Sequence, residues 1–152
     1  MVEASHLLDD NCRFTVLATK SVINQCIDQY KKLSPFICFE EASEEVLMDD
    51  SPLFVVRRKH NSTMAKGLQK LKEKKCDGLV TAGNTGAITT FASLELDKLP
   101  TIERAALLAT LPTEKGNVAI LDVGANVTFR PQYLMQFALL GAIYQKIEHN
   151  IS

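Results

Sequence analysis

Short runs rich in apolar and β-branched residues alternate along this chain with longer segments whose apolar residues recur at helical spacing. The pattern predicts strands at residues 13–19, 35–39, 77–82, 105–111 and 117–123. It predicts helices at residues 20–33, after an N-capping Ser51, around Met64–Leu71, at 87–96 and at 131–148. Strands and helices that alternate in this way form a largely parallel sheet covered by helices on both faces. The expected fold class is therefore α/β, in a single domain over residues 1–152.

The charge and composition of the chain exclude several classes of function. The 152 residues carry a net charge of −1, so the strongly basic surface typical of nucleic-acid-binding proteins is missing. The longest uninterrupted apolar run, Phe137–Tyr144, is far shorter than the roughly 20 residues that a membrane-spanning helix needs. The first residues lack the basic and apolar regions of a signal peptide, and the four scattered cysteines have no histidine at metal-ligand spacing. We therefore expect a cytoplasmic protein with reduced thiols, no bound metal and no nucleic-acid partner.

Two loops that contain glycine and asparagine each follow a predicted strand and precede a predicted helix. They are Gly83–Gly86 and Gly124–Asn126. Loops at the carboxyl ends of strands form the ligand-binding edge of open α/β sheets, and glycine lets the backbone approach an anion closely. The helix that follows adds free N–H groups, and Asn84 and Asn126 add side-chain amides. The alternative is that both loops are only tight turns, so the residues by themselves indicate an α/β protein that binds an anionic ligand.

The surroundings of these loops carry specific motifs. The chain contains DDSPLFVVRRKHNSTM, CDGLVTAGNTGAITTFASLELDKLPTIERAALLATLPTEKG and LDVGANVTFRPQYLMQFALLGAIY. From Arg13 onwards these stretches resemble the amino-terminal part of the bacterial phosphate acyltransferase family. The order AGNTGA, LPT, LDVGAN and QFA is the most specific part of the resemblance. It implies a fold similar to that of phosphotransacetylases and isocitrate-type dehydrogenases, of which this chain holds part of a two-lobed whole.

The resemblance also implies an activity. Members of that family transfer a fatty acyl group from acyl carrier protein to inorganic phosphate, and the acyl phosphate feeds the synthesis of phosphatidic acid. The family needs no metal and no bound cofactor, and it implies a homodimer with peripheral contact to the inner face of the membrane. Two alternatives stay open at this point. One is a truncated, non-catalytic homologue that binds acyl carrier protein or a full-length partner, and the other is a phosphotransacetylase acting on acyl-coenzyme A.

The resemblance assigns roles to residues of both loops. The groups expected to bind phosphate or stabilise the oxyanion are Gly83, Asn84, Thr85, Gly86, Gly124 and Asn126. The catalytic candidates are Asn84, Asn126 and Asp122, with Asp122 expected to orient the Asn126 loop rather than act as a base. The basic run Arg57, Arg58 and Lys59 contacts the carrier protein or its pantetheine phosphate, unless it is only a solvated helix end. His60 is expected to be a surface residue.

The chain also departs from the family pattern. The Asp-Ala-Met-Gly-Gly-Asp element with which members usually begin does not precede Arg13, and the sequence stops at Ser152, about half-way through a typical member. After LDVGAN the family usually has Val-Asp, where this chain has Val127 and Thr128. We therefore expect the chain to hold only part of the active site. The apolar residues of the last predicted helix are expected in the core or at a subunit interface, and they are Tyr133, Leu134, Phe137, Leu140 and Tyr144.

Overall fold

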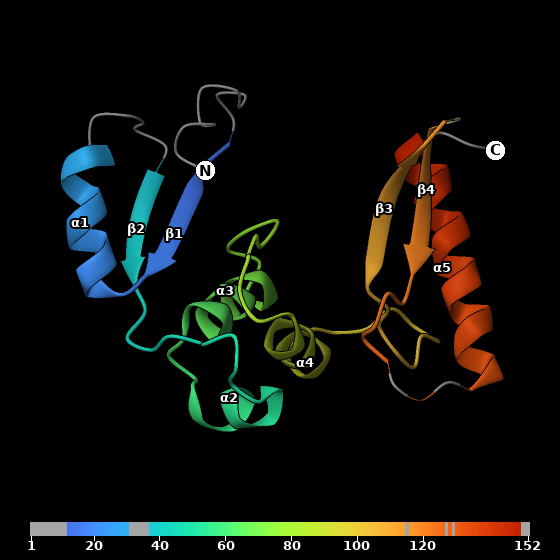
Figure 1. The fold of residues 1–152 in the computed structure, drawn as a ribbon, viewed down its shortest axis with the longest axis horizontal. Coiled ribbons are helices and arrows are strands. Elements are labelled where there is room, and N and C mark those ends of the chain that lie inside the picture. The colour runs from blue at the N-terminus through green and yellow to red at the C-terminus, as the bar shows by residue number, and fades with distance from the viewer. Residues whose placement is uncertain (1–11, 31–36, 115, 127, 129, 150–152) are drawn as a thin grey trace. The chain divides into compact units, whose positions relative to one another are not determined.

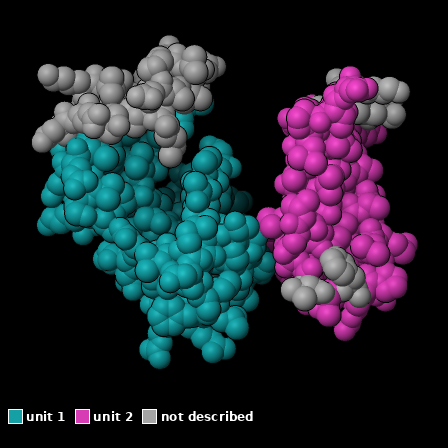
Figure 2. All heavy atoms as spheres, viewed as in Figure 1, with its two compact units in different colours: residues 1–96 teal, residues 97–152 magenta. Residues whose placement is uncertain are grey.

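The computed structural model describes residues 12–30, 37–114, 116–126, 128 and 130–149. Its contacts group the chain into two compact units, residues 1–96 and 97–152, drawn in teal and magenta in Figure 2. Both units combine strands with helices (Figure 1), so the predicted α/β class is confirmed.

The first unit opens with a parallel pair of strands. β1 (Phe14–Ala18) pairs with β2 (Ile37–Glu41), and Phe14 lies opposite Ile37. α1 (Lys20–Tyr30) follows β1 and packs against β2. A parallel neighbour needs a long crossover, and this strand–helix–strand unit is what the alternating sequence pattern predicted. β2 ends two residues later than predicted, and residues 31–36, where the helix and strand predictions meet, lie outside the described residues.

Three helices complete the first unit, namely α2 (Pro52–Arg58), α3 (Thr63–Lys72) and α4 (Thr85–Glu95). The predicted cap of α2 is confirmed, because Ser51 Oγ accepts the Phe54 N–H at 3.3 Å. Ser62 caps α3 in the same way. The buried apolar side chains that hold these helices together are Val55, Met64, Leu68, Ala87 and Phe91.

The strand predicted at residues 77–82 is missing from the described structure. Leu79 packs against α3, where a Cβ on Gly67 would lie only 2.7 Å from Leu79 Cδ1, but Val80 is 82% exposed. A cavity of about 240 Å³ is lined by Thr15–Leu17 of β1 and by Leu79–Ala82. Among the described residues, no backbone hydrogen bond joins the two segments. A strand requires a hydrogen-bonded neighbour, so this prediction was wrong even though the segment has a suitable composition.

The second unit contains an antiparallel hairpin instead of parallel strands. β3 (Leu108–Thr113) pairs with β4 (Gly116–Leu121), and two residues separate the strands in sequence. Both strands were predicted, although β3 begins three residues later than expected. The expectation of a largely parallel sheet holds only for β1 and β2. The reason is the length of the connection, because two residues can join antiparallel neighbours but cannot form the crossover that parallel strands need.

α5 (Pro131–His149) packs against β4 and confirms the predicted final helix. Gly141 permits the close approach, since a Cβ there would lie 2.9 Å from Leu121 Cδ1. Tyr133 and Phe137 are buried as predicted, whereas Leu134 is 55% exposed. A row of exposed apolar side chains at four-residue spacing follows another face of the helix, and its members are Met135, Leu139, Ile143 and Ile147. None of the helices in the described residues is long and apolar enough to cross a membrane.

Candidate anion-binding loops

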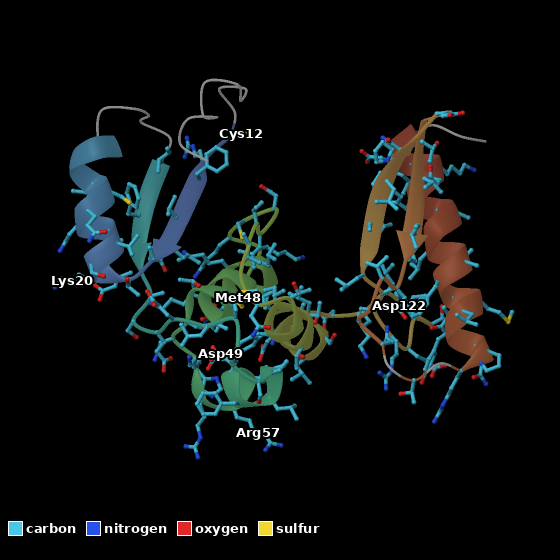
Figure 3. The ribbon with its side chains drawn as sticks, in the orientation of Figure 1. Cys12, Lys20, Met48, Asp49, Arg57 and Asp122 are labelled. Atoms are coloured by element: carbon cyan, nitrogen blue, oxygen red, sulfur yellow. The ribbon has the colours of Figure 1, made fainter. Side chains whose placement is uncertain are left out.

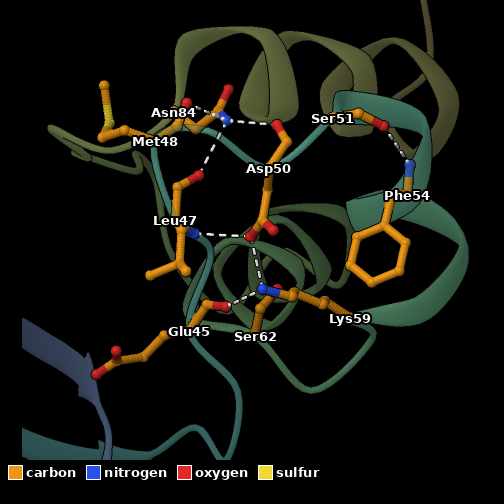
Figure 4. Close-up of polar contacts among 9 residues, drawn as sticks. All are labelled: Glu45, Leu47, Met48, Asp50, Ser51, Phe54, Lys59, Ser62 and Asn84. Atoms are coloured by element: carbon orange, nitrogen blue, oxygen red, sulfur yellow. Dashed lines mark hydrogen bonds and ion pairs between the residues drawn. The ribbon is translucent and has the colours of Figure 1, made fainter.

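Asn84 is the buried centre of the first candidate loop, Gly83–Gly86. Its side-chain oxygen accepts the Ala87 N–H at 2.9 Å and so caps α4. Its side-chain nitrogen donates to the carbonyls of Leu47 at 3.1 Å, Met48 at 3.2 Å and Asp50 at 2.9 Å (Figure 4). An asparagine amide has two N–H donors, and both are therefore used within the protein. Asn84, which is 6% exposed, thus braces the start of α4 against residues 47–50.

The groups of this loop that stay open are backbone N–H groups. Thr85 and Gly86 are the first two residues of α4, and no acceptor for their N–H groups is found among the described residues. Free N–H groups at a helix start, together with the helix dipole, favour an anion. Gly86 is also needed for packing, because a Cβ there would lie 2.9 Å from Cγ of Pro52. The loop therefore offers backbone donors, and the Asn84 side chain holds them in place.

Lys59 ties the segment before α2 to the end of that helix. Lys59 Nζ lies 2.5 Å from Asp50 Oδ2 and donates to the Glu45 carbonyl at 2.6 Å. The hydrogen bond from Lys59, followed by one from the Leu47 N–H, holds the pKa of Asp50 below its ordinary value of 3.8. Lys59 is thereby committed to an internal contact, in contrast to its two neighbours in the predicted basic run.

Arg57 and Arg58 end α2 with exposed side chains (Arg57 is labelled in Figure 3). Within the described part of the chain, neither of them takes part in an ion pair. His60 is exposed as predicted, and its Nε2 lies 3.1 Å from the Arg57 carbonyl. Large apolar side chains are also exposed on α2 and just before it, and they are Leu47, Met48, Leu53 and Phe54. This region combines positive charge with apolar surface.

Asp122 and Asn126 frame the second candidate loop, which follows β4 (Asp122 is labelled in Figure 3). Asp122 has a φ of 63° and Gly124 a φ of 111°, so two residues adopt the left-handed region. Asp122 Oδ1 accepts two hydrogen bonds from Asn126, one from its backbone N–H at 3.2 Å and one from its side-chain amide at 2.9 Å. The same amide donates to the Ala105 carbonyl at 3.1 Å. Asp122 Oδ2 is buried and has no hydrogen-bond partner among the described residues. In this arrangement the carboxylate holds Asn126 in place.

Two arginines that sequence reasoning did not select lie at this second loop. Arg104 Nη1 donates to Asn126 Oδ1 at 3.3 Å. The guanidinium carbon of Arg104 lies 5.6 Å from the ring centroid of Tyr133, and that of Arg130 lies 6.0 Å from it. The available signal was that Arg104 and Arg130 are two of only five arginines in the chain, and both stand inside the motif-bearing stretches. Only the fold brings Arg104 to Asn126, which is 22 residues away in sequence.

In each loop the asparagine side chain holds the backbone in place. The groups left open to a ligand are backbone N–H groups at the Gly83–Gly86 loop and guanidinium groups at the Asp122–Asn126 loop. These groups define an α/β protein with two loops suited to anions. A family model described as fatty acid synthesis protein matches residues 2–151, and the chain belongs to that family.

Among its relatives are three phosphate acyltransferases. The chain is 39% identical over 143 residues to that of Chlamydia caviae, 50% over 104 residues to that of Koribacter versatilis and 37% over 134 residues to that of Wolbachia pipientis wMel. These alignments cover 93%, 68% and 88% of this chain but 44%, 29% and 39% of the respective relatives. The chain thus spans less than half the length of these relatives.

Proposed function

We propose that the chain is part of a phosphate acyltransferase, which transfers a fatty acyl group from acyl carrier protein to inorganic phosphate. The acyl phosphate formed would serve phospholipid synthesis. The observation that carries this proposal is membership of the fatty acid synthesis protein family, together with the name phosphate acyltransferase of the matched relatives. That name favours this reaction over a non-catalytic homologue and over a phosphotransacetylase acting on acyl-coenzyme A.

The proposed reaction suits the open groups of the Gly83–Gly86 loop. A phosphate oxygen attacks the thioester carbonyl, a C–O bond forms, the C–S bond breaks, and the departing thiolate takes up the proton of hydrogen phosphate. Negative charge grows on the carbonyl oxygen during this attack. The N–H groups of Thr85 and Gly86 bind phosphate or stabilise that oxyanion. Since phosphate is already a nucleophile near neutral pH, the protein mainly has to position it.

The two asparagines and Asp122 act in this proposal as positioning residues. The amide of Asn84 is fully engaged by residues 47–50, so it sets the direction of the α4 N–H groups. The side-chain amide of Asn126 likewise donates to Asp122 Oδ1 and to the Ala105 carbonyl. Gly124 allows the backbone path of the second loop with its φ of 111°, and Gly83 leaves room for Met64, because a Cβ there would lie 2.5 Å from Met64 Cε.

Acyl carrier protein is proposed to contact the end of α2. Carrier proteins of this kind are acidic, and Arg57 and Arg58 are exposed and unpaired among the described residues. Charge-assisted contacts at a surface mainly accelerate association and weaken with salt. Lys59 contributes indirectly, by fixing the end of the helix through Asp50.

The carrier contact can be tested by substitution in a catalytically active protein. Arg58→Ala should raise the apparent KM for acyl carrier protein about fivefold at low ionic strength, with turnover nearly unchanged. The difference from the parent should shrink as salt is added. Arg13→Ala is the matched control, since Arg13 is also exposed but lies before β1. An equal effect of the two substitutions would remove α2 from the carrier interface.

A homodimer in the cytoplasm, with peripheral membrane contact, completes the proposal. The exposed apolar row on α5 supports the dimer, because monomeric proteins rarely leave large apolar patches uncovered. Leu139→Lys combined with Ile143→Lys should lower the apparent mass in light scattering if this row forms the interface. Unchanged association would place the interface elsewhere.

The reaction itself is tested with the chain alone and with the chain joined to the remaining part of the Chlamydia caviae relative. We expect the joined protein to form acyl phosphate from acyl carrier protein thioester and phosphate, and the chain alone to form none. Release of carrier thiol without phosphate dependence, or equal use of acyl-coenzyme A, would contradict the proposed function.

A further inference from the structure

We propose that Arg104 and Arg130, together with the Asp122–Asn126 loop, form a binding site for a phosphate group. That the bound anion is a phosphate rests on the proposed function, whereas the presence of an anion-binding site is argued from the geometry of the second unit. This assignment adds two binding residues that the loop motifs do not contain.

Both guanidinium groups lie close to one buried ring. Their carbons lie 5.6 Å and 6.0 Å from the centroid of Tyr133, which is 7% exposed. Tyr133 belongs to the first turn of α5, and its N–H donates to the Arg130 carbonyl at 2.9 Å. The ring thus holds both cations beside the start of a helix, where the dipole also favours negative charge.

Neither cation is neutralised within the described part of the chain. The ion pairs found there involve lysines, and every one of them lies in the first unit. Two like charges held near one ring repel each other, and an anion bound close to both lowers that repulsion. A guanidinium group also presents N–H donors in a planar fork that matches two oxygens of a phosphate.

Asn126 links the arginine to the acid of the loop. Its amide nitrogen is used by Asp122 and by the Ala105 carbonyl, and its oxygen accepts the hydrogen bond from Arg104. The amide therefore stands between the Asp122 carboxylate and the Arg104 guanidinium. Within the part of the chain that the structure describes, one N–H of Arg104 is engaged in this way, which fixes the group and leaves its other donors for a ligand.

The ligand chemistry, a phosphate group, has two sources in the proposed reaction. One is the inorganic phosphate that accepts the acyl group, and the other is the phosphodiester that joins the pantetheine arm to its carrier protein. Both would meet the same guanidinium donors, so binding of two probes must separate them.

The test is equilibrium binding to the full chain, followed by chemical shifts of backbone amides. The probes are inorganic phosphate and 4′-phosphopantetheine, each without acyl donor. Arg104→Gln should weaken binding of one probe about 10-fold or more, the effect of losing a charged hydrogen bond. Arg130→Gln should weaken it less, because no hydrogen bond from that side chain to the loop is found among the described residues. Arg13→Gln is the matched control and should leave binding within about twofold.

The outcomes separate the site from the reaction. Loss of phosphate binding alone assigns the site to the acceptor, and loss of phosphopantetheine binding alone assigns it to the carrier arm. Normal binding of both probes by a folded Arg104→Gln chain overturns the inference, as does a parent chain that binds neither probe. If Arg104→Gln fails to fold, Arg104→Lys is tested instead. Lysine keeps the positive charge but lacks the planar guanidinium donors, so this variant should still bind the probe more weakly. Arginine-dependent binding without any acyl phosphate formation by the joined protein would retain this site and reject the proposed function.

Discussion

In the Gly83–Gly86 loop the asparagine is buried and holds a distant backbone segment, whereas in the Asp122–Asn126 loop it is partly exposed and is itself held by a carboxylate. The acid next to the first loop, Asp50, is paired with Lys59. The acid of the second loop keeps one buried oxygen without a partner among the described residues.

This difference suggests two ways of preparing for an anion. In the first loop the Asn84 side chain is fully paired within the protein, and the loop offers neutral backbone N–H groups whose direction is fixed before any ligand arrives. The second loop contains two left-handed residues and is flanked by two arginines that form no ion pair with any described residue. We infer that the first loop contributes more to the stability of the fold, and that the second gains more from its ligand.

The largest expected effect is a difference in the free energy of unfolding between variants of the two asparagines. Asn84→Ala should lower the free energy of unfolding by about 3 kcal/mol, because it removes the cap of α4 and leaves three carbonyls without their donor. Asn126→Ala should cost only about 1 kcal/mol, since its surroundings are more open to water. Urea unfolding of both variants measures the difference. In the joined protein, Asn84→Ala should also lower turnover roughly 100-fold through displaced N–H donors. Equal losses of stability would break the comparison.

The next effect concerns what Asp122 does for its loop. Asp122→Ala should destabilise the chain by about 2 kcal/mol, because the Asn126 amide and N–H both lose their acceptor. Asp122→Asn should cost under about 1 kcal/mol, since asparagine keeps an oxygen at Oδ1 and tolerates positive φ. If Asp122 positions the loop, the asparagine variant of the joined protein retains most of its turnover. Equal loss of turnover in the two variants would instead indicate proton transfer by the carboxylate.

Glycine substitutions sharpen the same comparison on a smaller scale. Gly124→Ala should cost about 1 kcal/mol because its φ of 111° is disfavoured for residues with a Cβ. Gly83→Ala should cost less than Gly124→Ala. A Cβ there would lie 2.5 Å from Cε of Met64, but that atom is the far end of a flexible side chain and can move. Thermal unfolding of the two variants under one condition gives the order, and the reverse order would contradict it.

The smallest expected effect is the pH dependence of the Asp50–Lys59 pair. The pKa of Asp50 is lower in the folded chain than its ordinary value of 3.8, so the pair stabilises the fold above that pH. The contribution is lost as pH falls through the folded pKa. A double-mutant cycle with Asp50→Asn and Lys59→Met should therefore show less coupling at about pH 2 than at about pH 7. Coupling that is equal at both pH values would contradict the assignment.

Local rules were sufficient for much of the fold. The caps at Ser51, Ser62 and Asn84 each join a side chain to an N–H three residues later, so a short stretch of sequence contains both partners. The predicted Ser51 cap and the predicted helix α5 agree with the structure because both depend on residues that are close together in sequence. The hairpin could also have been anticipated, because the few residues between the two predicted strands exclude a parallel crossover.

Long-range contacts decided what local rules could not. Residues 77–82 have the composition of a strand, yet a strand forms only by pairing with another strand that is far away in sequence. The nearby strand is β1, and residues of β1 and of this segment line a cavity instead. The amide donors of Asn84 and Asn126 were expected to face a ligand. Each donor meets a carbonyl or carboxylate of the protein, and the acceptors of Asn84 lie 34 to 37 residues away.

The sequence by itself therefore determined the α/β class, the starts of α1, α2 and α5, and the family, because periodicity, capping and motif order are properties of neighbouring residues. Only the tertiary structure decided which polar groups remain open to a ligand. That choice depends on which donors and acceptors the fold has already paired, and those pairs form between segments that the sequence keeps far apart.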